Sequence, residues 1–397
     1  MRWSIIAVAA FAFHAFIAAS GVILAAPYRP ADPSVVLERL PLRQGDERAR
    51  ELAAVRARLA AQPRNAEIAV DLADRYFDLA NAEGDPRYIG YAQAALAPWA
   101  DDPHPPTEVL VARAKLLQWR HEFRAALKLF GEVLKREPDH YDALSWRAAV
   151  NTVFADYEGA RRDCLALREK EKELFWAGCL AYVDGLTGRA AEAERRMADL
   201  LARHPDTGPW QKLWLRSHLA DLAARLGRPT DADRHYRAGL ALDVKSQNLL
   251  ANYAEFLLDE RRPAEVVALL RDATRSDVLL LRLTLAEQAL GAPEFKSHAQ
   301  ALRERFAAAA LRGDTLHQQD ESRFQLLIER NAERALALAV ANWEVQREPY
   351  DARVLLEAAV AARRVEAAQP ALEWLERSRY EDPRLAALAR ALRERKP

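Results

Sequence analysis

Apolar residues recur along the chain in pairs of stretches, each with the spacing of an amphipathic helix. Over residues 174–205 two such stretches flank Gly185 and Gly188, which predicts a helix, a bend and a second helix. Ala181 in the first stretch and Ala193 in the second lie twelve positions apart. Antiparallel helices approach closely only where their side chains are small. The segment therefore predicts one helical hairpin whose helices cross at these two alanines.

The same spacing occurs at four further places in the chain. In each place a small or branched residue is followed twelve positions later by a second one, and four positions after that by a residue that fills the layer between hairpins. The four sets are Ala114/Ala126/Phe130, Ala148/Ala160/Cys164, Ala220/Ala232/Tyr236 and Ala254/Val266/Leu270. With Ala181 included, the first members are 34, 33, 39 and 34 residues apart. A period near 34 indicates stacked hairpins, because each hairpin alone leaves an apolar side that its neighbour must cover.

This pattern resembles the tetratricopeptide repeat (TPR) superfamily, whose signature places A-x3-F and then Pro in the second helix. Two units match that half of the signature, with Ala126-x3-Phe130 and Pro138 in one and Ala193-x3-Met197 and Pro205 in the other. The first half departs from it, since Leu110 or Ala177 stands for the Trp and Ala for the Gly. The resemblance implies an all-α fold, a right-handed superhelical solenoid of about nine TPR-like hairpins.

An export signal is expected over residues 1–26. From Trp3 to Ala26 the only side chain able to carry a charge is His14, and the run is long enough to cross a bilayer of about 30 Å as a helix. It is either a cleaved signal peptide or an anchor retained in the inner membrane. Both readings place the rest of the chain in the periplasm.

The remainder divides by composition and repeat phase. A Pro-rich spacer is expected at 27–45, an N-terminal capping helix at 46–61, an irregular first hairpin at 65–106, regular repeats at 107–275, degenerate repeats at 277–380 and a C-terminal capping helix at 384–397. In the irregular hairpin Ala73 and Ala92 are nineteen apart, which predicts a turn enlarged by seven residues. Its Tyr88, Tyr91 and Trp99 either form a contact surface or fold the turn back on its own helices.

Charge and motifs exclude several functions. Lys and Arg number 58 and Asp and Glu also 58, so the sequence lacks the basic surplus of a nucleic-acid-binding protein. Nucleotide-binding, hydrolase, zinc-protease and C-x-x-C motifs are absent from it. Asp101, Asp102 and His104 come nearest to a metal-ligand set but are better explained as an exposed acidic loop. We therefore expect no enzymatic activity, no cofactor and no metal site.

Two functions remain compatible with these features. The first is a protein–protein interaction scaffold of the bacterial cell envelope, which holds a segment of another envelope protein on its concave face. The second is a structural or assembly factor for an envelope secretion or biogenesis complex, acting by self-association or by docking on a membrane protein. Nothing in the sequence selects the partner or the pathway.

The resemblance also implies which residues would line the concave groove. In the superfamily these are the second, fifth, ninth and twelfth positions of each first helix, and the first crossing alanine is the eighth. The assigned partner-binding residues are Asp74, Phe77, Lys115, Gln118, Tyr182, Trp214, Asp221, Asn248, Glu255 and Glu287. Acidic and aromatic side chains in that set favour a peptide with Arg or Lys and apolar anchors. The alternative is a solvated face without a ligand.

Cys164 and Cys179 are the only cysteines. The repeat phase places them on the second helix of one hairpin and the first helix of the next, which pack side by side in a solenoid. Export to an oxidising compartment would allow a disulfide between them. The alternative is a pair of buried free thiols that act as small apolar side chains.

Overall fold

The computed structural model describes residues 47–169, 173–314 and 316–394, and all regular structure within these ranges is helical. The expected export signal and the Pro-rich spacer lie outside the described residues. The helices are α1 (Glu47–Ala61), α2 (Ala66–Glu83), α3 (Arg87–Ala95), η1 (Ala97–Trp99), α4 (Thr107–Trp119), α5 (Phe123–Arg136), α6 (Tyr141–Val153), α7 (Tyr157–Ala166), η2 (Leu167–Glu169), α8 (Glu173–Leu186), α9 (Ala190–Arg203), α10 (Pro209–Arg225), α11 (Pro229–Leu240), α12 (Gln247–Asp259), α13 (Pro263–Leu270), α14 (Asp277–Leu290), α15 (Phe295–Arg312), α16 (Gln318–Leu327), α17 (Ala332–Val345), α18 (Pro349–Ala362), η3 (Glu366–Ala368), α19 (Gln369–Ser378) and α20 (Pro383–Arg393).

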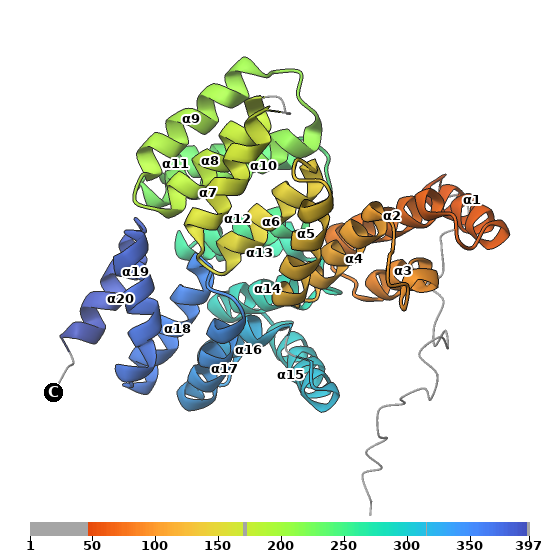
Figure 1. The fold of residues 1–397 in the computed structure, drawn as a ribbon. Helices are drawn as coiled ribbons and strands as arrows, with labels where there is room; N and C mark the ends of the chain where they lie inside the picture. The colour runs from red at the N-terminus through yellow and green to blue at the C-terminus, as the bar shows by residue number, and fades with distance from the viewer. Residues whose placement is uncertain (1–46, 170–172, 315, 395–397) are drawn as a thin grey trace, which may run out of the picture. The chain divides into compact units, whose positions relative to one another are not determined.

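Consecutive helices pair into nine hairpins within the described ranges, from α2/α3 to α18/α19, with α1 before them and α20 after them (Figure 1). Each hairpin also contacts the next, as α5 contacts α6 and α9 contacts α10. The predicted all-α solenoid is confirmed. None of the described helices is long and apolar enough to cross a membrane.

The predicted crossing residues are buried where the two helices of a hairpin meet. Ala181 and Ala193 are both fully buried, and a Cβ added to Gly185 would lie 3.4 Å from the Ala193 Cβ. The alanines predicted for the other units are equally inaccessible, at Ala114, Ala126, Ala148, Ala160, Ala220, Ala232 and Ala254. Small side chains therefore set the distance between the helices, as the spacing predicted.

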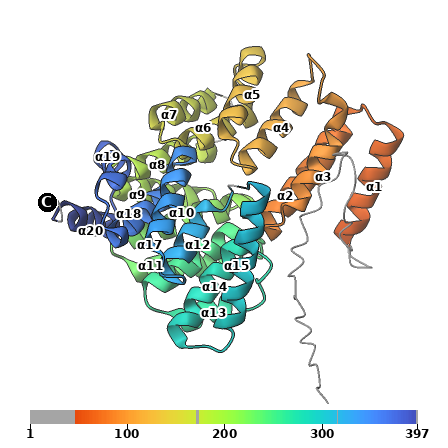
Figure 2. The same cartoon turned by 90° about the horizontal axis from the view of Figure 1, so that it is seen from below.

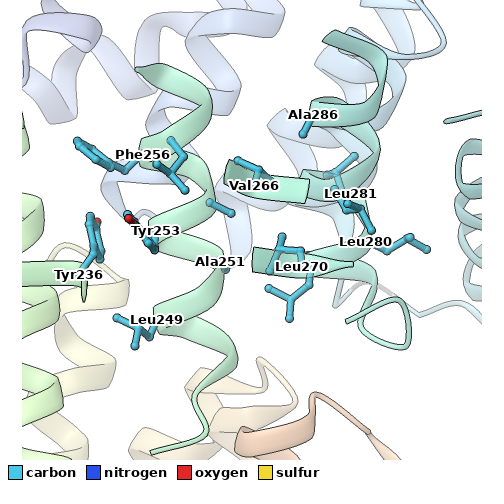
Figure 3. Packing of buried hydrophobic residues seen from close by; sticks show 14 of the residues in the cluster. Tyr236, Leu249, Ala251, Tyr253, Phe256, Val266, Leu270, Leu280, Leu281 and Ala286 are labelled. Atoms are coloured by element: carbon cyan, nitrogen blue, oxygen red, sulfur yellow. The ribbon is translucent and has the colours of Figure 1, made fainter. Parts of the chain in front are cut away.

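Bulkier residues fill the layers between hairpins, as Figure 3 shows for the layers on either side of α12. Tyr236 of α11 stacks on Tyr253 of α12 with ring centroids 5.0 Å apart. On the other side, Val266 and Leu270 of α13 are fully buried beside Leu280 of α14. This burial of apolar surface between units is what stabilises a stack of hairpins.

A residue with positive φ lies in the turn of every hairpin in the described chain. Glycine occupies four of these turns, at Gly84, Gly188, Gly227 and Gly291, and other residues occupy five, at His121, Ala155, Arg261, Arg330 and Arg363. The left-handed conformation ends the first helix, and the next helix begins after three or four residues. Gly188 is thus at the bend as predicted, whereas Gly185 lies inside α8 and serves close packing.

The first hairpin differs from the expected enlarged turn. Its α2 continues to Glu83 and α3 begins at Arg87, so the extra residues lengthen the helix to 18 residues instead of forming a loop. Tyr88 and Trp99 are buried, and the Tyr91 ring lies 5.4 Å from that of Tyr76. Of the two interpretations of these aromatics, the structure supports the one in which they fold back on their own helices.

The C-terminal hairpins also contact hairpins far away in the sequence. Trp343, Leu355 and Trp374 share a core with Leu186 of α8 and with Tyr157 and Tyr182, and the Arg347 amide donates to the Val153 carbonyl over 2.7 Å. Figure 2 shows α17 and α18, drawn in blue, from below. The first helices of the middle hairpins are therefore covered by the chain's own C-terminal part.

Candidate binding groove

We use the term first-helix groove for the face formed by α2, α4, α6, α8, α10, α12, α14, α16 and α18. At its centre Glu255 of α12 is 8% exposed. Arg323 Nη1 of α16 donates to Glu255, Arg353 Nη1 of α18 lies 3.3 Å from its Oε1, and Arg282 Nε of α14 lies 3.5 Å from its Oε2. The Tyr350 hydroxyl donates to Oε2 over 3.1 Å. Glu255 is thus enclosed by the chain's own cations.

These cations decide the charge of the buried carboxyl. Burial alone would raise the pKa of Glu255, but Arg323, Arg282 and Arg353 together hold that pKa well below its ordinary value. Arg282 also donates to Asp320 over 3.0 Å, so α12, α14, α16 and α18 share one ionic network. The acidic position that was predicted to hold a partner's Arg or Lys holds three arginines of this chain instead.

A second set of contacts joins the end of α12 to the C-terminal helices. Arg353 donates to both Asp259 oxygens, over 2.7 and 2.8 Å, and Arg384 of α20 donates to the same carboxylate. Arg384 Nη2 also donates to Asp382 Oδ2 over 2.8 Å. This part of the groove is closed by bidentate pairs, the strongest arrangement open to a guanidinium and a carboxylate.

Asp221 of α10 belongs to a third contact with the C-terminal part. Its Oδ2 accepts from Arg225 Nε over 2.9 Å, and Arg225 Nη1 donates to the Gly185 carbonyl over 3.0 Å. The Tyr380 ring lies 4.4 Å from the Arg225 guanidinium, and Glu381 accepts from the Ala190 amide over 2.6 Å. The turn between α19 and α20 therefore occupies the groove beside α8 and α10.

Tyr182 and Trp214 lie next to this turn, and their rings are 6.2 Å apart. His218 packs against both, 4.4 Å from Tyr182 and 4.5 Å from Trp214. Burial lowers the pKa of His218 to about 4. Trp214 stays 38% exposed, so it is the accessible edge of an otherwise buried ring cluster.

At the N-terminal end, Asp74 and Lys115 form an ion pair of 2.5 Å across α2 and α4. The Lys115 ammonium lies 5.2 Å from the Phe77 ring centre, and Phe77 packs edge-on against Trp146 at 5.7 Å. Gln118 Oε1 is buried, with no hydrogen-bond partner among the described residues. Asp74, Lys115 and Phe77 therefore lie together, as the sequence predicted, and their charged and aromatic groups are in contact with one another.

The last two assigned positions lie apart from these clusters. Asn248 is exposed at the start of α12. Glu287 is 3% exposed, and its carboxylate contacts His298 Nδ1 of α15 at 2.9 Å. It therefore points into its own hairpin and not into the groove. This contact within its own hairpin does not support the assignment of Glu287 to the groove.

A pocket lies between the C-terminal helices α16, α18 and α20. It has a volume of about 510 Å³ and is lined by Arg323, Leu326, Leu327, Arg330, Ala332, Arg353, Glu357, Ala361 and Leu388. These residues come from α16, the α16–α17 turn, the start of α17, α18 and α20. We call it the C-terminal pocket. Pockets of this size, with mostly apolar walls and a few polar groups, are typical of binding sites.

Sequence reasoning did not assign any residue of the C-terminal pocket. The repeat pattern is weakest there, and α16 has only 10 residues, so no register could be set. Arg282, Arg323 and Arg353 all lie on successive first helices, and that recurrence was the available signal.

Two further sites considered from the sequence are the acidic loop and the cysteine pair. In residues 47–169, 173–314 and 316–394 no three His, Cys, Asp or Glu side chains are arranged to hold a metal ion. Asp102 accepts from Arg64 over 3.0 Å and from the His104 amide, as in an ordinary loop. Cys164 and Cys179 form a disulfide with Cα atoms 5.6 Å apart. Its presence in the protein in solution stays a prediction.

No protein-family model and no curated protein matches the chain. Among solved structures, a chain of the APC/C hetero-tetramer Cut9–Hcn1 is similar with a TM-score of 0.50 and 14% identity, over 88% of this chain and 68% of that one. A tetratricopeptide repeat protein from Parabacteroides merdae ATCC 43184 has a TM-score of 0.46 and 18% identity, over 60% of this chain and 92% of that one. The TPR domain of P58(IPK) has a TM-score of 0.23 and 14% identity, over 88% of this chain and 93% of that one.

At these identities the similarity concerns the fold alone. The match to the Cut9–Hcn1 chain, with its TM-score of 0.50, supports the description of that fold. It agrees with the nine helix pairs, the buried crossing alanines and the stacked layers described above. The described chain thus has the fold of a TPR-like solenoid of helical hairpins.

Proposed function

We propose that the chain is a non-enzymatic protein–protein interaction scaffold of the bacterial cell envelope, and that it binds a segment of a partner protein in the C-terminal pocket. The observation that supports this is the pocket itself. It lies on the first-helix side of α16, α18 and α20, where the chain leaves about 510 Å³ unfilled. Leu326, Leu327 and Leu388 give it apolar walls.

The middle of the groove is a weaker candidate for the partner. Glu255 and Asp259 are already paired with Arg323, Arg353 and Arg384. A partner's cation would have to displace a buried guanidinium, and removing one member of a buried ion pair costs about 3–5 kcal/mol. Binding at the C-terminal pocket requires no such exchange.

The envelope location rests on the uncharged run at residues 3–26 and on the close approach of the two cysteines. Disulfides persist in oxidising compartments such as the bacterial periplasm and are rare in the cytosol. Both features favour export. Neither identifies the partner.

In-cell photo-crosslinking tests the proposal. A photoreactive residue at Ala361, exposed on the pocket wall, is expected to cross-link one partner protein in the native envelope. The same residue at Ala191, exposed on α9 away from the pocket, is the control. If both positions give the same cross-linked species, the pocket is not the binding site. If Ala361 gives none, the scaffold function loses its support.

Self-association is the second candidate. Trp210 and Trp214 are 53% and 38% exposed and lie one turn apart on α10. Exposed tryptophans are typical of interface anchors. Light scattering of the full-length protein is expected to show an oligomer that Trp210→Ser disrupts if this candidate is right. A monomer would exclude it.

A further inference from the structure

A short segment of the C-terminal part is held in the first-helix groove by groups of the middle hairpins. Helix α19 ends at Ser378, Arg379 has the left-handed conformation with φ of 54°, and α20 begins at Pro383. Residues 380–382 between them are not helical, and Asp382 is extended, with φ of −145° and ψ of 117°. We call residues 380–382 the C-terminal strap. The strap contacts α9 and α10, which lie far from it in the sequence.

Three kinds of group on the strap are bound by the middle hairpins. The Tyr380 ring lies 4.4 Å from the Arg225 guanidinium, which is a cation–π contact. Glu381 Oε2 accepts from the Ala190 amide over 2.6 Å, and the Glu381 carbonyl accepts from Arg225 Nη1 over 3.4 Å. Ala190 is the first residue of the 14-residue helix α9, so the positive end of that helix faces the carboxylate. An aromatic ring, a carboxylate and a backbone carbonyl are thus recognised together.

The α8–α9 turn closely approaches the residue that precedes the strap. A Cβ added to Gly188 would lie 2.9 Å from the Arg379 Cβ and 3.1 Å from the Arg379 carbonyl oxygen. Gly188 also has φ of 76°, which other residues rarely adopt. The glycine therefore lets a second backbone pack directly against this turn. We call Gly188, Ala190 and Arg225 the α9 cradle.

The α9 cradle keeps its own charge paired without the strap. Arg225 donates to Asp221 over 2.9 Å and to the Gly185 carbonyl over 3.0 Å, and these acceptors belong to α10 and α8. The Ala190 amide is one of the first four of α9, and water can satisfy such amides at a helix end. Glu381 itself is exposed. Departure of the strap therefore leaves the buried guanidinium paired and frees a surface that fits an aromatic ring and a carboxylate.

We infer that the C-terminal strap is an autoinhibitory contact: it occupies the α9 cradle, which otherwise binds a partner segment with an aromatic residue directly followed by an acidic one. The ligand chemistry is that of Tyr380 and Glu381, whose contacts are described above. Because the strap is tethered, its effective concentration is high, and a partner's apparent affinity falls with the fraction of chains whose cradle is free. The inference goes beyond the proposed function, since it concerns another part of the groove and does not depend on the C-terminal pocket.

Binding of the strap's own sequence in trans tests the inference. The probe is a fluorescent peptide of residues 378–384 with both ends capped, and the protein is the full-length chain in detergent. Two variants weaken the strap without altering the cradle, because Glu381→Lys puts a cation at the positive end of α9 and Tyr380→Ala removes the ring. Fluorescence anisotropy is expected to show that each binds the peptide at least about tenfold more tightly than wild type. Glu373→Lys, the same charge change at an exposed position on α19, is the control and should bind as weakly as wild type.

Peptide variants and hydrogen exchange identify the site. A peptide carrying Tyr380→Ala should not bind the Glu381→Lys protein, whereas one carrying Tyr380→Phe should bind normally because it keeps the ring. A peptide carrying Glu381→Gln should bind about tenfold more weakly, since it lacks the charge that faces α9. Amide exchange at residues 188–191 should slow when the unmodified peptide binds.

Circular dichroism establishes whether each protein variant is folded. Folded variants that bind the peptide no better than wild type would overturn the inference, and so would binding that is insensitive to the peptide's Tyr and Glu or leaves exchange at residues 188–191 unchanged. If neither variant folds, the strap is an integral part of the fold and not a displaceable contact, which also overturns the inference. The cross-link at Ala361 bears only on the proposed function, so the two can fail separately.

Discussion

The indole Nε1 of Trp374 donates a hydrogen bond to the Tyr157 hydroxyl over 2.9 Å, although the two residues are 217 positions apart. Trp374 lies on α19 and is 2% exposed, and Tyr157 begins α7. In an extended solenoid each repeat contacts only its neighbours. This bond shows that the ninth hairpin also packs on the third. The described chain should therefore unfold more cooperatively than an open array of repeats.

Tyr157→Phe tests this closure. The substitution leaves the Trp374 N–H buried without an acceptor, at an expected cost of about 1–3 kcal/mol in the free energy of unfolding. Urea unfolding followed by tryptophan fluorescence measures it. The wild-type chain should unfold in one transition detected alike by fluorescence and by circular dichroism.

The matched control is Tyr88→Phe, because the Tyr88 hydroxyl donates to Glu83 of its own hairpin, over 3.4 Å. Its effect should be smaller than that of Tyr157→Phe. A C-terminal part that unfolds in a separate, earlier transition would show that the long-range contact does not couple the hairpins.

Ala193→Leu tests the packing of the fourth hairpin. Ala193 is fully buried 3.4 Å from the position of a Gly185 Cβ, so three added carbon atoms must displace α8 or α9. The expected cost is about 1–3 kcal/mol. Thermal unfolding measures it against Ala191→Leu, an exposed position on the same helix that should change little. Equal melting temperatures would mean that the crossing adapts without strain.

The crossing alanines were predictable and the closure was not, for one physical reason. Ala181 and Ala193 belong to a single hairpin, so their contact leaves a period in the sequence. Glu255 instead pairs with Arg323, 68 positions away, and no period links them. The sequence indicates that Glu255 faces the groove, but only the path of the whole superhelix determines what meets it there. The C-terminal pocket escaped prediction for the same reason.

Reduction of the Cys164–Cys179 disulfide should destabilise the hairpins that it joins. A bond closing a loop of about 15 residues stabilises a protein by about 3 kcal/mol in the chain-entropy model. Mass spectrometry of alkylated, unreduced protein is expected to show no free thiol. The double variant Cys164→Ala with Cys179→Ala should unfold at lower urea, with and without reductant. Two alkylated cysteines in native protein would contradict the bridge.

Glu348 should make stability depend on pH. It precedes α18 at the contact with α6 and α8, and burial, assisted by the nearby Asp351 carboxylate, raises its pKa to about 7 from an ordinary 4.5. The folded state then holds a proton that the unfolded state has lost between these two values. Stability from this group is therefore highest below about pH 4.5 and is lost as the pH rises through 7.

Glu348→Gln removes the titration and keeps the shape of the side chain. The difference in urea midpoint between variant and wild type should grow in favour of the variant from pH 5 to pH 8. The lowered pKa of His218 makes stability rise with pH, which is the opposite direction. Such contributions from other groups are the same in both proteins and cancel in the difference. Glu344→Gln, at an exposed position on α17, is the control. A difference that does not vary with pH would contradict the raised pKa.

Glu255 is expected to be structural, and Glu255→Gln tests this. The substitution keeps the side-chain volume but leaves Arg282, Arg323 and Arg353 with one negative charge fewer in a buried site. Breaking a buried ion pair by removing one partner costs about 3–5 kcal/mol. Glu260→Gln, exposed one residue beyond α12, should cost far less.

A double-mutant cycle separates the ion pair from the other effects of the substitution. If the carboxylate stabilises the closure through Arg323, then Glu255→Gln combined with Arg323→Gln should cost less than the sum of the two single variants, with a coupling energy of about 0.5–3 kcal/mol. Both single variants should also weaken the contact of α16 and α18 with α12, detected as faster hydrogen exchange in those helices. Additive effects together with unchanged exchange would show that Glu255 does not hold the C-terminal hairpins in the groove. In that case the carboxylate would again be a candidate for binding a partner's cation.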